Sequence, residues 1–315
     1  MRVLLATVAL LLAANPAGAA PNRVSALKIT VLSTMLADAG IGEWGFAALV
    51  EVDGKRILFD TGARPRTVLE NARELGIDLS NITDVVLSHN HGDHTGGLLT
   101  LRRELAKQNP NALSRAHVAR GAFYSRSSPK GETNQLLIDR AAYEATGAKF
   151  IERDRPIEIA NGVWLTGPVP RVHPERNWSV TGMLKGPDGP VEDTIPEDQS
   201  LVFNTADGLV VLSGCGHAGI VNTLEYARKI VRAAPVHAAI GGFHLFILDD
   251  QKLAWTVQKL REFGLAHLLG AHCTGIEAVY RIRAGAGLDR KHCVVAAVGS
   301  SFTLGAGIDP RQLAR

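Results

Sequence analysis

Four potential metal ligands lie within six residues of the chain, directly after a short apolar segment, 84–87, that predicts a buried strand. They are His89, His91, Asp93 and His94. The first two lie on an extended segment and can converge on one ion. Gly92 then allows a tight turn through which the last two can face a second ion. Imidazole and carboxylate groups at this density suit zinc, and iron and manganese are also compatible with them. A solvated His-rich turn is the alternative, but it explains neither the density of ligands nor their place at a strand end.

Three further glycine-rich turns that contain a histidine follow predicted strands in the second half of the chain. They are 213–219 with Cys215 and His217, 241–245 with His244, and 270–275 with His272. In α/β folds, binding sites are built at the carboxyl ends of the strands. His244 is therefore a candidate for metal or substrate binding, with a structural role as the alternative. A core or surface role is expected for the other histidines, which are His117, His173, His237, His267 and His292.

Two ions in such a cluster would support hydrolytic chemistry. Divalent ions held about 3.5–4 Å apart can share one water molecule and lower its pKa toward about 7. The resulting metal-bound hydroxide is a nucleophile, and the same ions stabilise negative charge on a carbonyl or phosphoryl oxygen. Asp93 would hold one ion and accept a hydrogen bond from the hydroxide, so it is the candidate catalytic residue.

The pattern His-x-His-x-Asp-His formed by residues 89–94 resembles the signature of the metallo-β-lactamase superfamily. The resemblance extends over nearly the whole mature chain and implies an αββα sandwich of two mixed sheets flanked by helices. The segment 59–62 resembles the early Asp-x-Gly element of this family, in which the aspartate supports the metal-binding loop through hydrogen bonds. This resemblance gives Asp60 that supporting role, and a helix-cap or turn role is the alternative.

The same resemblance identifies His217 as a metal ligand and His272 as the last ligand of the set. One position departs from the family pattern. Most members have a bridging aspartate after the strand that corresponds to 209–212, and Cys215 occupies this position here. Cys215 is either a sulfur ligand or a small buried residue. Cys273 and Cys293 are expected to be structural.

Two segments, Gly-Cys-Gly-His-Ala-Gly-Ile-Val-Asn and His-Cys-Thr-Gly, narrow the resemblance to the branch of dihydropterin-ribofuranosylaminobenzene-phosphate synthase-like hydrolases. Three functions follow. The first is an exported metal-dependent hydrolase of an ester, lactone, amide or phosphoester. The second is a phosphoribosyl-type transferase or synthase, against which export argues because its precursors are cytosolic. The third is a metal-binding protein without catalysis, against which the complete set of signature ligands argues.

The elements that must position these residues follow from hydrophobic periodicity and turn residues. Strands are predicted at 26–32, 45–52, 55–59, 84–87, 115–119, 149–151, 157–165, 201–204, 209–212, 236–240, 267–269 and 294–298. Helices are predicted at 67–75, 98–108, 135–145, 220–232, 252–263 and 276–283. The segment 167–196 is expected to be a long surface excursion. Because no flexible linker divides the chain, residues 26–308 are predicted to form one α/β domain.

Residues 1–19 have the pattern of a cleaved secretory signal peptide. Arg2 precedes an apolar run, 3–14, and a small-x-small cleavage site follows at 17–19. An uncleaved anchor is the alternative, but a spanning helix needs about 20 apolar residues. The mature protein is therefore expected to begin at Ala20, to have no membrane anchor, and to be periplasmic or secreted. The three cysteines cannot all pair with one another.

The composition limits the kinds of molecule that the protein can be expected to bind. Of the 315 residues, 46% are hydrophobic, which excludes a disordered chain. The net charge is only +3, without a dense run of Lys or Arg, and aromatic residues make up 5%. A nucleic acid would need a basic surface or a stacking platform, so a small-molecule substrate is expected instead. The sequence makes no prediction of the oligomeric state.

Overall fold

The computed structural model describes residues 21–177 and 182–313. The predicted signal peptide, residues 1–19, lies outside the described residues. The first of two large sheets contains β1 (Leu27–Ser33), β2 (Ala47–Val52), β3 (Lys55–Phe59), β4 (Asp84–Val86), β5 (Arg115–Ala119), β8 (Lys149–Arg153), β18 (Ser301–Thr303) and β19 (Gly307–Asp309). Their order across the sheet is β19-β18-β1-β2-β3-β4-β5-β8.

The second large sheet contains β9 (Ile157–Ala160), β10 (Val163–Leu165), β13 (Ser200–Asn204), β14 (Leu209–Ser213), β15 (Val236–Gly241), β16 (His267–Gly270) and β17 (Cys293–Val295), in the order β17-β16-β15-β14-β13-β10-β9. Both sheets are mixed. In the first, β3, β4, β5 and β8 are parallel neighbours. In the second, β14, β15, β16 and β17 are parallel neighbours. The polar turns after these parallel strands therefore lie at one end of each sheet.

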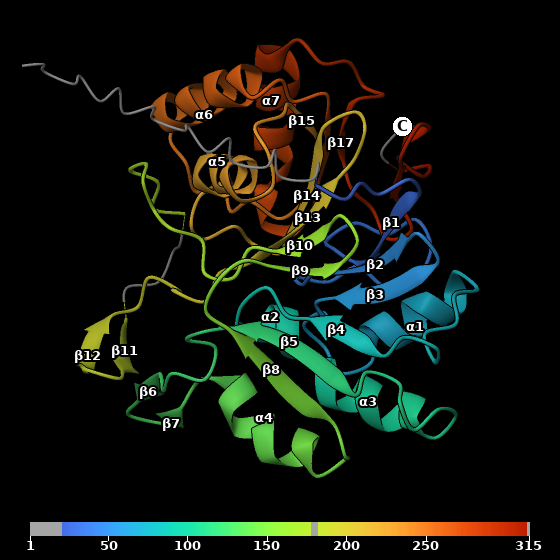
Figure 1. Ribbon diagram of the computed structural model, residues 1–315, viewed down its shortest axis with the longest axis vertical. Coiled ribbons are helices and arrows are strands. Elements are labelled where there is room, and N and C mark those ends of the chain that lie inside the picture. The colour runs from blue at the N-terminus through green and yellow to red at the C-terminus, as the bar shows by residue number, and fades with distance from the viewer. Residues whose placement is uncertain (1–20, 178–181, 314–315) are drawn as a thin grey trace, which may run out of the picture.

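Helices cover the outer face of each sheet (Figure 1). On the first sheet they are α1 (Thr67–Glu74), α3 (Leu98–Ala106) and α4 (Gln135–Glu144). On the second sheet they are α5 (Ile220–Ile230), α6 (Asp250–Glu262) and α7 (Ile276–Ala286). Short elements complete the chain, namely α2 (Gly92–Thr95), β6 (Ser127–Ser128), β7 (Gly131–Glu132), β11 (Met183–Gly186), β12 (Gly189–Glu192) and the 3₁₀ turn η1 (His272–Thr274).

Alternation along the strands explains why the two sheets pack face to face. In β2, Val50 lies in the core between the sheets, whereas Leu49 lies in the core under α1, α3 and α4. In β14, Leu212 faces the first sheet and Val211 faces α5, α6 and α7. Successive strand residues point to opposite faces, so strands that are apolar on both faces need a partner on each side. The predicted αββα sandwich is confirmed.

Most predicted elements agree with the structure within a few residues, but one predicted strand is wrong and several short strands were not predicted. The segment 157–165 is a hairpin of β9 and β10 rather than one strand. Gly162 makes the turn at φ +70°, and a Cβ there would lie 2.8 Å from the backbone nitrogen of Val24. The strands β18 and β19 were not predicted, and they return the end of the chain to β1.

The segment 167–196, expected to be a long surface excursion, also contributes structure that the sequence did not indicate. It contains the β11–β12 hairpin and several buried residues. The buried carboxylate of Glu175 accepts hydrogen bonds from the backbone nitrogens of Val221 and Asn222, at 3.2 and 2.8 Å. Gly219, the residue before α5, has no side chain to cap the helix, so a carboxylate distant in sequence satisfies its first N–H groups.

The described ranges contain no helix with both the length and the apolar character needed to cross a membrane. All three cysteines are buried and free.

Candidate metal centre

The candidate ligands all follow the carboxyl ends of parallel strands. The turn after β4 carries His89 and His91 and leads into α2, which carries Asp93 and His94. His217 follows β14, His244 follows β15, and His272 lies in η1 directly after β16. The two sheets thus deliver side chains from opposite sides to one location.

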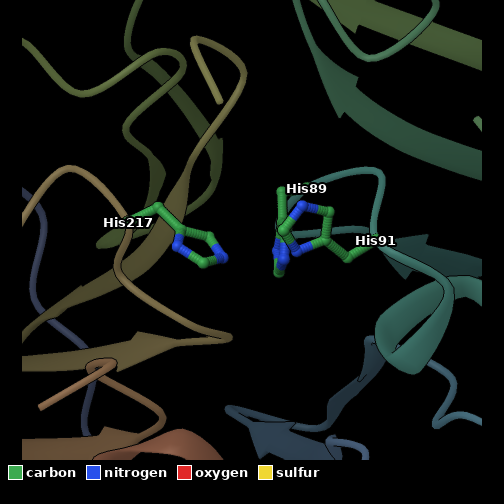
Figure 2. A group of neighbouring side chains, drawn as sticks. All are labelled: His89, His91 and His217. Atoms are coloured by element: carbon green, nitrogen blue, oxygen red, sulfur yellow. The ribbon is translucent and has the colours of Figure 1, made fainter. Parts of the chain in front are cut away.

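Three imidazoles form the first ligand group (Figure 2). One nitrogen each from His89, His91 and His217 lies within 4.8 Å of the other two. The ring of His217 points toward the other two from the opposite side, with ring centroids 4.7 Å from His89 and 5.0 Å from His91. The Nε2 atoms of His89 and His217 are buried and have no hydrogen-bond partner.

Asp93, His94 and His272 form a second group, in which one ligand atom from each lies within 4.8 Å of the others. Nε2 of His272 lies 3.3 Å from Oδ2 of Asp93, and Nε2 of His94 lies 3.9 Å from Oδ1 of Asp93. Neither ring nitrogen of His272 has a hydrogen-bond partner, although the ring is buried. The rings of His89 and His94 are 4.2 Å apart, so the two groups adjoin.

Hydrogen bonds from neighbouring residues fix the orientation of three of these imidazoles. Oδ2 of Asp60 pairs with Nδ1 of His94 at 2.7 Å and accepts a hydrogen bond from Oγ of Ser88 at 2.7 Å. Because the hydroxyl proton of Ser88 points to Asp60, Oγ of Ser88 is free to accept a hydrogen bond from Nδ1 of His89, at 2.9 Å. Nδ1 of His217 donates to the carbonyl of Asn177 at 2.7 Å. Each contact occupies Nδ1, so Nε2 is left to face the centre, as in metal-binding histidines.

At the candidate metal centre, the turns approach each other closely, and three residues have strained backbone angles. A Cβ at Gly214 would lie 2.0 Å from Oγ of Ser88 and 2.5 Å from Oδ2 of Asp60, so only glycine lets the turn after β14 come this close. Asp60, His244 and His272 adopt left-handed backbone angles, with φ of 55°, 47° and 45°. Such angles are costly for residues other than glycine, and they cluster at functional sites.

The electrostatics favour cation binding. Burial and the neighbouring imidazoles hold the pKa of His89 and His217 well below the usual range, and burial lowers the pKa of His91 to about 4. Burial opposes ionisation of Asp93, but His94 and His272 outweigh it and lower the pKa of this carboxyl. Near pH 7 these three histidines are therefore neutral and Asp93 is ionised, the protonation states in which such side chains bind metals.

His94 differs from the other three histidines. Burial lowers its pKa, but the carboxylates of Asp60 and Asp93 outweigh burial and raise the pKa to about 9. Before metal binding, His94 carries a proton near pH 7, which the two carboxylates balance. A metal ion at Nε2 would take the place of this proton.

The structure also brings His244 to the centre. Its ring centroid lies 4.6 Å from that of His217, and both its ring nitrogens are buried without a hydrogen-bond partner. The five histidines for which ordinary roles were expected belong to none of the potential ligand groups among the described residues. For example, Nε2 of His117 contacts Asp84 at 2.8 Å and Nε2 of His173 contacts Glu225 at 2.6 Å.

Three neighbours of the centre had not been predicted from the sequence. Cys273, expected to be structural, has its Sγ 3.2 Å from that of Cys215. Trp44 and Phe246 are each 48% exposed, and the Trp44 ring lies 4.7 Å from the ring of His272 and 5.4 Å from that of Phe246. Cys273 could have been suspected from its place beside His272, but single aromatic residues in predicted turns have no spacing that marks them.

Comparison with known proteins decides the family. Residues 45–228 match the family model of the metallo-β-lactamase superfamily. The chain belongs to this superfamily. The predicted resemblance is therefore confirmed. Proteins of this metallo-β-lactamase fold bind divalent metals, and the residues gathered here could hold them.

Three relatives of the chain within the metallo-β-lactamase fold are informative. The chain is 30% identical over 270 residues to the 7,8-dihydropterin-6-methyl-4-(β-D-ribofuranosyl)-aminobenzene-5′-phosphate synthase of Methanocaldococcus jannaschii, which covers 82% of this chain and 90% of that protein. The chain is also similar to a metal-dependent hydrolase of the β-lactamase superfamily whose crystal structure is known, at 30% identity and with a TM-score of 0.64. The match covers 82% of this chain and 93% of that chain. Zn²⁺-bound PqqB from Methylobacterium extorquens shares the fold at 13% identity, with a TM-score of 0.52 and coverage of 87% and 99%.

Proposed function

We propose that this protein is a metal-dependent hydrolase that uses two divalent ions, with zinc as the expected metal, to cleave an ester, lactone, amide or phosphoester. One observation carries the proposal. Ligand atoms of six side chains converge in two adjoining groups, and the buried Nε2 atoms of His89 and His217 have no hydrogen-bond partner in the protein. Buried polar atoms are almost always satisfied, so these atoms fit a metal. The likeness to a metal-dependent hydrolase at 30% identity supports the same class.

The residues divide naturally between two ions. His89, His91 and His217 would hold the first ion, and Asp93, His94 and His272 would hold the second. When bound, such ions acidify a water molecule and polarise the bond that it attacks. Fe²⁺ and Mn²⁺ suit nitrogen and oxygen ligands as well, and they are the alternatives to zinc.

The protein's own groups then orient the reactants. The Asp93 carboxylate is 23% exposed and lies beside both His94 and His272, so Oδ1 or Oδ2 can accept a hydrogen bond from the attacking water and align it. The free ring nitrogens of His244 can donate a hydrogen bond to an oxygen of the substrate that gains negative charge. Export to the periplasm or the medium belongs to the same proposal, on the evidence of the N-terminal sequence alone.

The metal content tests the proposal most directly. Protein expressed with zinc or manganese is expected to hold up to two ions per chain, removable by a chelator. Removal should lower the melting temperature, because an ion at 100 times its Kd stabilises the folded state by about 2.7 kcal/mol. Elemental analysis and thermal unfolding measure both effects, with His292→Ala as the control that keeps its metal. A preparation without stoichiometric metal would refute the proposal. If the protein holds metal, a panel of chromogenic esters, lactams and phosphoesters tests whether it is a catalyst.

Two exposed aromatic residues beside the centre, Trp44 and Phe246, give a prediction about substrate binding. Trp44 and Phe246 are half-exposed, and their rings lie 4.7 Å from the ring of His272 and 5.0 Å from that of His244, respectively. Trp44→Ala is expected to raise KM roughly 10-fold, about 1.4 kcal/mol, with kcat nearly unchanged, because the ring contacts a part of the substrate that does not react. Tyr280→Ala removes another exposed aromatic ring and should leave both constants unchanged. A fall in kcat at constant KM would contradict this role for Trp44.

A synthase is the second candidate, because the relative from Methanocaldococcus jannaschii is one. In that case an acceptor molecule would take the place of water at the same centre. Product analysis with and without a phosphoribosyl donor separates the two candidates. Turnover that requires the donor supports the synthase, and turnover in water alone supports the hydrolase.

A further inference from the structure

A cleft of about 580 Å³ lies at one edge of the sandwich, between β9 and the inner face of the first sheet. Strand β9 is the last strand of its sheet, as β8 is of the other. Inner-face residues of β3 and β4, such as Phe59 and Val86, belong to the core between the sheets, but β5 and β8, which are described in full, contribute none. His117 of β5 lies beside Val86 on this same face. The inner face thus changes from apolar to polar at the edge of the second sheet.

Both carboxylates that line the cleft already have partners in the protein. Asp84 accepts two hydrogen bonds from Arg115, at 2.8 and 2.5 Å, and one from Nε2 of His117 at 2.8 Å. Oε1 of Glu158 accepts a hydrogen bond from the backbone nitrogen of Gly162 at 2.6 Å. The cationic side chains of the cleft outnumber these two carboxylates, and they are Lys55, Arg56, Arg115 and Arg153.

Two of these cations have no counter-charge. Arg56 lies 3.6 Å from the carboxylate of Glu51, outside the cleft, whereas Lys55 and Arg153 make no ion pair with any residue of 21–177 and 182–313. Nε of Arg153 is buried without a hydrogen-bond partner. A charged group that is partly buried without a partner is costly. The cleft therefore favours a ligand with about two negative charges.

His117 offers a further contact for such a ligand. It is only 7% exposed, and its Nδ1 has no hydrogen-bond partner. Because Nε2 donates to Asp84, an imidazolium at this position would be stabilised by that carboxylate and could donate a second hydrogen bond from Nδ1. Buried polar atoms are almost always satisfied, so this nitrogen is suited to an anionic oxygen in the cleft.

The wall that β9 contributes is apolar. Ile157 and Ile159, alternate residues of this edge strand, line the cleft and are only partly buried. The volume of the cleft lies within the range of about 300–1,000 Å³ that is typical of small-molecule sites, and it exceeds the needs of an inorganic ion. The cleft therefore suits a ligand that has an organic part as well as a charged group.

We propose that this cleft binds an organic phosphate, whose phosphate group contacts Arg153 and Nδ1 of His117 and whose organic part lies against Ile157 and Ile159. A phosphate monoester carries about −1.5 to −2 charges near pH 7, which matches the two unpaired cations. Guanidinium groups bind phosphate through paired hydrogen bonds. Among the described residues, no residue of the cleft belongs to a potential metal-ligand group, so this site is separate from the metal centre and independent of the proposed function.

Isothermal titration calorimetry of the metal-loaded full chain with phenylphosphonate tests the proposal, because this probe has no ester bond that a hydrolase could cleave. Arg153→Ala is expected to weaken binding by about 10-fold or more, the usual effect of losing a hydrogen bond to a charged group. Arg155→Ala is the matched control, since it removes the same charge two residues away, from a side chain that is 84% exposed and outside the cleft. It should bind the probe as the wild type does. Metal content and the far-ultraviolet circular dichroism spectrum should be the same in all three proteins.

Methylphosphonate has the same charged group without the aromatic ring, and it should bind about 10-fold more weakly than phenylphosphonate because it buries less apolar surface. Equal affinities for the two probes would overturn the role of Ile157 and Ile159. Binding of phenylphosphonate that is equally tight in wild type and Arg153→Ala would place the probe elsewhere, for example at the metal centre, and would refute the site. Absence of binding at millimolar concentration would refute it as well. None of these results alters the metal content, so the proposed function is tested separately.

Discussion

Replacing Asp93 with alanine is expected to lower kcat by about 100-fold or more, the usual cost of removing a key electrostatic group at a reaction centre. Asp93 is the signature residue that can serve both a metal ion and the attacking water. Its carboxylate lies 3.3 Å from His272 and 3.9 Å from His94, and its ionised form is favoured by these neighbours. Steady-state kinetics on a substrate identified by the chromogenic panel measures the loss.

Two further variants show whether the loss comes from the carboxylate itself. Asp93→Asn keeps the shape of the side chain but removes the charge, so it should lose most of the same activity. His292→Ala lies outside the centre and should behave as the wild type. The assignment of Asp93 fails if Asp93→Ala keeps both full metal content and full turnover.

Asp60→Asn is expected to weaken metal binding by about 10–100-fold, the usual effect of removing a hydrogen-bond partner of a metal ligand. The two carboxylate oxygens of Asp60 accept from the backbone and side chain of Ser88 and pair with Nδ1 of His94. In asparagine, an NH₂ donor replaces one of the two carboxylate oxygens that accept these contacts. The side chain could then no longer hold the proton of His94 on Nδ1. Competition with a chromogenic chelator measures the affinity.

Asp84→Asn is a matched control for this experiment. Asp84 also pairs with a histidine, since Nε2 of His117 contacts its Oδ1 at 2.8 Å, but it takes part in none of the potential ligand groups. Its substitution should leave metal affinity unchanged. Equal affinities in wild type and Asp60→Asn would show that His94 does not depend on this carboxylate.

The sequence was most informative where ligands are neighbours in the chain. The spacing of residues 89–94 predicted a cluster of potential metal ligands at the end of a strand, and the αββα fold followed from the resemblance to the superfamily. The contacts of Asp60 with Ser88 and His94 agree with the supporting role that the resemblance implied, while the metal-binding roles stay predictions. The histidines in the glycine-rich turns of the second half could be singled out as well. Each follows an apolar strand, and the carboxyl ends of parallel strands meet at one edge of the sheet.

Interactions between segments far apart in the chain were the ones that sequence could not supply. Glu175 caps α5 from more than 40 residues away, and nothing in its local sequence indicates a buried carboxylate. Trp44 reaches the ring of His272 only because the two sheets pack face to face, whereas Cys273 meets Cys215 because β14 and β16 end at the same edge of the second sheet. The turn at Gly162 was missed because the apolar residues on both sides of it read as one strand.

The division of ligands between the two sheets has a consequence for biosynthesis. His89, His91, Asp93 and His94 follow β4 in the first sheet, whereas His217 and His272 follow β14 and β16 in the second. A growing polypeptide has four of the six proposed ligands before the second sheet is synthesised, and the set is complete only when residue 272 has been made and the sheets have docked. Under the proposed function, metal binding is therefore expected to follow docking of the two sheets, unlike in small zinc modules that fold around their ion.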